Sequence, residues 1–256
     1  AAAAAARAAA ESANGPVPGA DATSPGALRS IFGQYLAASG TPGAQALEPV
    51  DALHAYADLG LLRCVALDAA QAAVTAAVAA SEGTPEAKGG SLVSPAPFAA
   101  CAKKLAALQV RSTYKGPDVV ELIGEDRRLM FAAFEAFGGS KHGMRPDGFE
   151  ATVRACGLIG AKVTEGTAAV IFAKCKHLAG NKSMAPKVMT FEGFAQACAH
   201  VAAEYSVKFE VVKDRVFKCA PKTETQKAQE TAEKARKEAA RKAKEVAEAA
   251  APVRKP

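Results

Sequence analysis

The chain has 256 residues, of which 50% are hydrophobic but only 6% are aromatic, and it contains no tryptophan. Its 21 glycines and 14 prolines follow no period, which excludes a collagen-like fibre, and no run of about 18 to 20 large apolar residues is present, which excludes a protein that crosses a membrane through helices. The 32 Lys and Arg exceed the 26 Asp and Glu, so an acidic partner is expected. The six cysteines form no CxxC pair and are expected to be reduced intracellular thiols.

Residues 1–26 are rich in alanine and then in glycine, proline and serine. They offer no large side chain to bury, so nothing offsets the entropy cost of ordering them, and we expect a disordered tail. A plastid or mitochondrial transit peptide is the alternative interpretation. A single Arg set against Glu11 and Asp21 fits such a presequence poorly.

Four helices are predicted within residues 27–112. The first begins near Leu28, where large apolar residues recur at i, i+3, i+4, i+7 and i+8. The others are expected over 50–59, over the alanine-rich run that follows Asp68, and over 98–108.

Residues 113–126 are predicted to be a linker, and four more helices with larger side chains are predicted within residues 127–207. Pro146 suits the first turn of the second of these helices. Thr164 and Thr190 are good N-caps for the third and the fourth.

Residues 208–222 are predicted to be a connector that leads to a tail over 223–256. Between residues 223 and 250 the tail consists almost entirely of good helix formers, with Val246 as its only large apolar residue. Because it has no face to bury in a core, we expect a basic helix that is either solvated or laid on an acidic surface.

The two groups of four helices align with each other at a nearly constant offset. Phe32 aligns with Phe131, and the stretch DALHAYADLGLL aligns with DGFEATVRACGLI after one gap. Phe98 aligns with Phe194. We interpret the two groups as copies of one four-helix unit.

Four motifs follow one another in the second copy: FAAFEAFG, DGFEATVRACGLI, KVTEGTAAVIFAK and TFEGF. Together they resemble the tubulin polymerization-promoting protein family (the p25-alpha domain), most clearly over residues 127–205. Residues 27–110 join the resemblance only through their similarity to the second copy. The core of the family motif is Phe131, Phe134, Phe149, Ile171, Phe172, Phe191 and Phe194. The glycine-rich C-terminal signature of that family has no counterpart in residues 207–220.

The resemblance implies an all-α fold of EF-hand-like helix pairs. We therefore predict two EF-hand-like four-helix units in tandem, followed by a C-terminal basic helix. It also implies a non-enzymatic structural protein that binds tubulin and stabilises microtubules in the axoneme of a cilium or flagellum, beside other axonemal filament proteins. A cytoplasmic location is the alternative, and no membrane partner is expected.

Microtubules are strongly acidic, so the basic residues of the second copy are candidates to face tubulin. These candidates are Lys141, Arg145, Lys174, Lys176, Lys182 and Lys187.

No metal, cofactor or catalytic residue is predicted. The loops GGSKHGMRPDGF and AGNKSMAPKVMTFE hold one Asp and one Glu, far fewer oxygen ligands than Ca²⁺ requires. Zinc is suggested by the pairs Cys175/His177 and Cys198/His200, but residues two apart point to different sides of a helix and cannot bind one ion. GxSxG, P-loop and GxGxxG motifs are absent.

Two other classes of function stay open. The first is a calcium-independent EF-hand-derived adaptor that holds a partner helix, although 4 Met and 11 Phe leave little apolar area for a groove. The second is a nucleic-acid-binding protein that uses the Lys- and Ala-rich tail, although the glutamates of the tail would face phosphates.

Overall fold

The computed structural model describes residues 20–39, 41, 43–82, 84–85, 91–112, 114–176 and 187–221. These residues form helices and no strand, which confirms the predicted all-α class. The predicted tail over 223–256 lies outside the described residues, as do residues 1–19.

The helices begin and end close to the predicted positions. The first half contains η1 (Ala20–Thr23), α2 (Pro25–Ala38), α3 (Pro49–Asp58), α4 (Leu67–Ser81) and α5 (Pro95–Arg111). The second half contains α6 (Gly124–Ala136), α7 (Pro146–Ala155), α8 (Glu165–Cys175), α9 (Phe191–Tyr205) and α10 (Phe209–Cys219). The predicted N-caps Thr164 and Thr190 are confirmed, because each hydroxyl accepts from an amide three residues later, at 3.1 Å.

Each half contains two helix–loop–helix segments whose loops meet through backbone hydrogen bonds. In the first half, Leu47 and Val93 exchange N–H···O bonds of 2.9 and 2.7 Å between the α2–α3 and α4–α5 loops. In the second half, Met144 and Met189 exchange two bonds of 2.8 Å between the α6–α7 and α8–α9 loops. The paired positions differ by 97 residues (144 − 47) and 96 residues (189 − 93).

Helices α3 and α7 also end in the same way. Gly60 and Gly157 adopt φ of 71° and 62°, in the left-handed region. The next residues, Leu61 and Leu158, are buried and donate their amides back to the last turn of the helix at 2.8 and 2.9 Å. This is the Schellman geometry, in which the amides of the glycine and of the next residue satisfy carbonyls of the last helical turn.

Substitution of Gly157 by Ala is expected to lower the free energy of unfolding by about 1 kcal/mol, because a Cβ is disfavoured at φ 62° even though the space around Gly157 is open. The matched control is Gly33→Ala, at an exposed position inside α2 that is also open around the Cα. There the same change should raise the free energy of unfolding by about 0.5 to 1 kcal/mol. Urea unfolding measures both, and equal signs would contradict the assignment of strain to Gly157.

Helix α10 is a correction to the predicted connector over 208–222. Its residues Val212 and Val216 are buried, and the helix packs against α9, α6 and α7. The apolar positions Phe209, Val212 and Val216 follow i, i+3 and i+7, so the helical period is present in the sequence.

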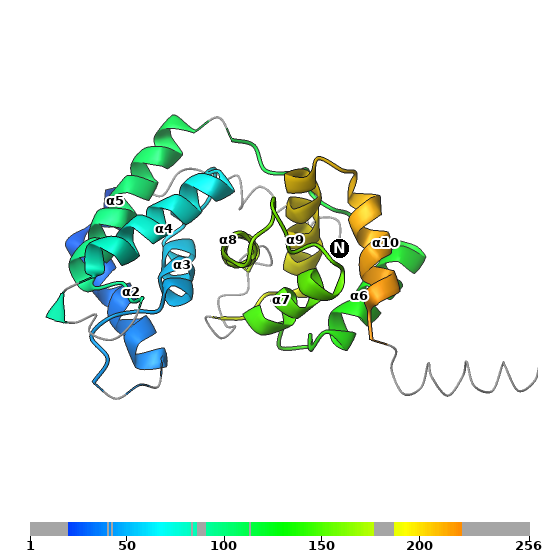
Figure 1. Cartoon of the computed structure of the whole chain (residues 1–256), viewed down its shortest axis with the longest axis horizontal. Helices are drawn as coiled ribbons and strands as arrows, with labels where there is room; N and C mark the ends of the chain where they lie inside the picture. The colour runs from blue at the N-terminus through cyan, green and yellow to red at the C-terminus, as the bar shows by residue number, and fades with distance from the viewer. Residues whose placement is uncertain are drawn as a thin grey trace, which may run out of the picture. The chain divides into compact units, whose positions relative to one another are not determined.

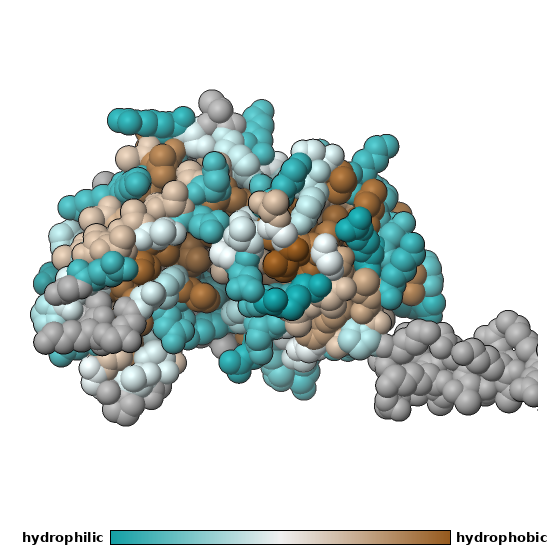
Figure 2. Space-filling view, in the orientation of Figure 1, coloured by the Kyte–Doolittle hydropathy of each residue, from teal (hydrophilic) through white to brown (hydrophobic). Residues whose placement is uncertain are grey.

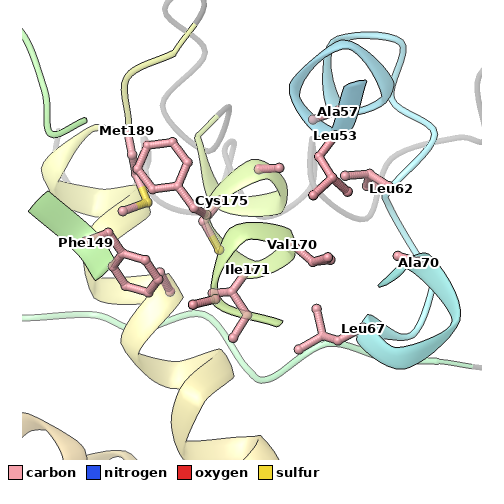
Figure 3. Packing of buried hydrophobic residues seen from close by; sticks show 14 of the residues in the cluster. Leu53, Ala57, Leu62, Leu67, Ala70, Phe149, Val170, Ile171, Cys175 and Met189 are labelled. Carbon is pink, nitrogen blue, oxygen red and sulfur yellow. The ribbon is translucent and has the colours of Figure 1, made fainter. Parts of the chain in front are cut away.

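Helix α8 lies between the two halves (Figure 1). It packs against α3 and α4 of the first half and against α7 and α9 of the second, and the described residues up to Ala220 form one compact unit. Figure 3 shows Val170 of α8 turned toward Leu62 and Leu67 of the first half. Cys175 of the same helix is turned toward the second half, where Phe149 lies. The division into separate units over 27–112 and 127–207 stays a prediction.

The family-motif residues are buried with one exception. Phe134, Phe149, Ile171, Phe172 and Phe194 are at most 1% exposed, and Phe191 is 7% exposed. Phe131 is 40% exposed and lies at the surface of α6, where its ring contacts those of Phe134 and Phe191 at 6.1 and 5.3 Å between centroids.

Candidate functional site

The structure places Lys176, a predicted tubulin-facing residue, in the interior. Its side chain is 1% exposed, and its Nζ lies 2.7 Å from Oδ1 of Asp58. The same Nζ donates to the hydroxyl of Tyr35 at 2.9 Å, and that hydroxyl donates to Oδ2 of Asp58 at 2.6 Å. The ammonium group is therefore engaged by the first half of the chain.

Burial shifts the pKa values of Lys176 and Tyr35 in this cluster. It lowers the pKa of Lys176, and the carboxylate of Asp58 opposes that shift. Burial, together with the hydrogen bond to Asp58, raises the pKa of Tyr35, so this hydroxyl remains a donor across the physiological range.

Two more of the predicted tubulin-facing lysines contact the first half. The Nζ of Lys187 lies 2.7 Å from Oδ1 of the buried Asp51. The Nζ of Lys174 donates to the carbonyl of Val65 and lies 4.7 Å from the ring centre of Tyr114. Burial lowers the pKa of Lys174 to about 8.

Side chains other than the lysines extend this interface along α8. The rings of His54 and Phe172 meet edge to face with centroids 5.4 Å apart. The amide of Gln71 on α4 accepts from the hydroxyl of Thr167 at 3.0 Å and donates to that of Thr164 at 3.4 Å. The basic residues of α8 thus lie in a mixed apolar and polar interface with α3 and α4.

Lys141 and Arg145 are exposed, as predicted for residues that face a partner. Lys141 lies on the tight turn closed by Ser140 and Gly143, and it forms no ion pair with any residue in the described ranges. The side chain of Arg145 is 80% exposed, and its Nε lies 3.7 Å from Oδ1 of an equally exposed Asp147. An ion pair this exposed contributes little to stability. Lys182 lies outside the described residues.

Among the residues that the structure describes, no group of three or more His, Cys, Asp or Glu side chains could hold a metal ion. Cys175 and Cys198 are buried, and burial raises the pKa of Cys175 to about 12 and also raises that of Cys198. These thiols pack as small apolar groups. His177, their possible partner in a zinc site, is outside the described residues.

A second surface, which the sequence did not predict, is formed by the segment 114–123, α9 and α10. The amide of Gln196 on α9 fixes this segment, since it donates to the carbonyls of Pro117 and Asp118 at 3.2 Å and accepts from the amide of Val120 at 3.1 Å. Gln196 is buried, and these three hydrogen bonds satisfy its side-chain amide.

No described helix combines the length and the hydrophobicity that a membrane span requires. Searches of the curated proteins and of the solved structures found no match. A comparison with protein-family models did find one. The p25-alpha model matches residues 128–242, so this part of the chain carries a p25-alpha domain, and the resemblance seen in its motifs is confirmed.

Proposed function

We propose that the protein binds tubulin and stabilises microtubules as a non-enzymatic structural component. The observation that carries this proposal is the p25-alpha match over residues 128–242, because that family is associated with microtubules. The place that fits such a protein is the axoneme of a cilium or flagellum, with other axonemal filament proteins as further partners.

Matched geometry supports the proposal that 27–112 and 127–207 are two EF-hand-like copies. The bridges at Leu47 and Met144 and the glycine caps at Gly60 and Gly157 recur at an offset of 97 residues in both cases (144 − 47 and 157 − 60). Each copy pairs two helix–loop–helix segments through their loops, which is the arrangement that EF-hand pairs share. Helix α8 of the second copy packs against α3 and α4 of the first copy. The two copies would therefore bind a filament as a single module.

Lys141 and Arg145 are the described residues that we propose for tubulin contact. Both are exposed next to the α6–α7 turn, where a strongly acidic surface can approach them. We propose that Lys174, Lys176 and Lys187 hold the two halves together instead, because each is engaged by a residue of the first half or its backbone.

The double substitution Lys141→Glu/Arg145→Glu is expected to weaken binding to taxol-stabilised microtubules about tenfold, since it replaces two attractive charges by repulsive ones. Cosedimentation at 50 mM salt measures the pelleted fraction. The matched control is Lys103→Glu/Lys104→Glu, two exposed lysines on α5 whose reversal changes the net charge equally.

A binding site in the tubule lumen could be closed to protein that is added after assembly, so the cosedimentation experiment is done in two ways. The protein is added to finished microtubules in one, and it is present during assembly in the other. Absence of pelleting in both would overturn the proposed function, and an equal loss in both variants would overturn the assignment of Lys141 and Arg145.

A further inference from the structure

An open groove of about 410 Å³ lies between the extended segment 117–122, α9 and α10. Its apolar lining comes from alanines of α9 and from Val119, Leu122, Val207 and Phe209. Val119 and Val207 are 42% and 40% exposed. Figure 2 shows hydrophobic atoms at the surface over the turn that connects α9 to α10. The groove therefore offers apolar contacts that the described part of the chain leaves uncovered.

The backbone of the same segment offers hydrogen bonds. Asp118 and Val120 turn their carbonyl and amide toward Gln196 on α9. The carbonyl of Pro117 also accepts from Gln196, so Gln196 engages the backbone on the α9 side of the segment. The amides of Val119 and Glu121 donate to no residue in the described ranges, as at the free edge of a sheet.

The charges around the groove are acidic. Asp118, Glu121 and Glu210 line it and are exposed. Lys213, the one cation among the described lining residues, is paired with Asp126 at 2.6 Å. Three carboxylates thus face solvent beside an apolar floor without a compensating cation in the lining.

The turn that forms one end of the groove is held in an unusual conformation. Ser206, between α9 and α10, has φ 56° and ψ 39°, and it is the only non-glycine residue with positive φ in the described part of the chain. This left-handed cap lets the chain reverse, so that Val207 lines the groove and α10 packs back onto α9.

We propose that this groove docks an extended basic segment of a partner protein. Such a segment pairs its backbone with Val119 and Glu121, places an apolar side chain on Val119 and Val207, and directs alternate Lys or Arg side chains to Glu121 and Glu210. Strand addition to a free edge combines backbone hydrogen bonds with alternating side-chain contacts in this way. The acidic rim repels an acidic polymer, so the partner is of a different class from tubulin.

The test uses the full chain and a fluorescent eight-residue peptide of alternating lysine and valine. Fluorescence anisotropy should show saturable binding that weakens as salt rises from 50 to 300 mM. Glu121→Lys/Glu210→Lys should weaken it about tenfold. The matched control is Glu82→Lys/Glu135→Lys, which makes the same change in net charge at exposed positions outside the groove lining.

Two further peptides test the backbone pairing and the charge complementarity separately. The same peptide with its valine amides methylated should bind at least tenfold more weakly, because methylation removes the donors of one strand edge. A peptide of alternating glutamate and valine should not bind. Equal affinity for the methylated or the acidic peptide, or an equal loss in both pairs of variants, would overturn the proposal.

Discussion

Lys176→Met should lower the free energy of unfolding by about 3 kcal/mol. The substitution keeps most of the apolar length of the side chain but removes the ammonium group that lies 2.7 Å from Asp58. Removal of one member of a buried ion pair takes a favourable charge partner from the other member, which costs about 3 to 5 kcal/mol. Asp58 is 19% exposed and keeps its bond from Tyr35, so we expect the lower end of that range.

Urea unfolding followed by circular dichroism measures this change. Arg128→Met is the matched control, because Arg128 forms its ion pair with Glu125 while 75% exposed, and no measurable change is expected there. Lys176→Met, Asp58→Asn and the double variant form a thermodynamic cycle. If the single effects simply added, Lys176 and Asp58 would not stabilise each other and the interface would depend on its apolar contacts.

The sequence was sufficient for most of the helices and for some of their ends. Periodic apolar residues predicted eight of the nine described α-helices, and Thr164 and Thr190 predicted two of the N-caps. The ninth, α10, has a regular spacing at Phe209, Val212 and Val216. A short segment with many charges resembles a connector, but three apolar positions suffice for a helix when neighbouring helices cover them.

The burial of the lysines could not be predicted from local sequence. Lys174 and Lys176 are two charged residues next to a region with more lysines, and such clusters usually face water. Their partners Val65 and Asp58 lie more than 100 residues earlier in the chain, and no spacing rule connects them. Long stems let lysines cover apolar surface while the ammonium group finds a carboxylate or carbonyl, so charge alone does not locate a binding face.

His200 should make the protein sensitive to acid. It lies on α9, is 7% exposed, and its Nδ1 has no hydrogen-bond partner within the described ranges. The segment at Gly116 packs on its ring, since a Cβ there would lie 3.3 Å from Cε1. Burial lowers the pKa of His200 from 6.5 to about 3, and the positive charge of Lys174 adds to this shift.

The direction in which stability changes with pH follows from proton binding in the folded and unfolded states. Below pH 6.5 the unfolded chain binds a proton at His200, whereas the folded chain does so only near pH 3. Stability that is present at neutral pH is therefore lost as the pH falls, and His200 accounts for about 2 kcal/mol between pH 7 and pH 5.

His200→Gln removes this titrating group while it keeps a polar side chain of similar size, so the free energy of unfolding should fall less steeply between pH 7 and pH 5 than in the unsubstituted protein. Carboxylates such as Glu204, whose pKa is raised by burial, titrate in both proteins and cancel in the difference. The matched control His142→Gln makes the same change at an exposed histidine on the α6–α7 turn. If His200→Gln left the slope unchanged, or if His142→Gln flattened it equally, the loss of stability in acid would not come from the burial of His200.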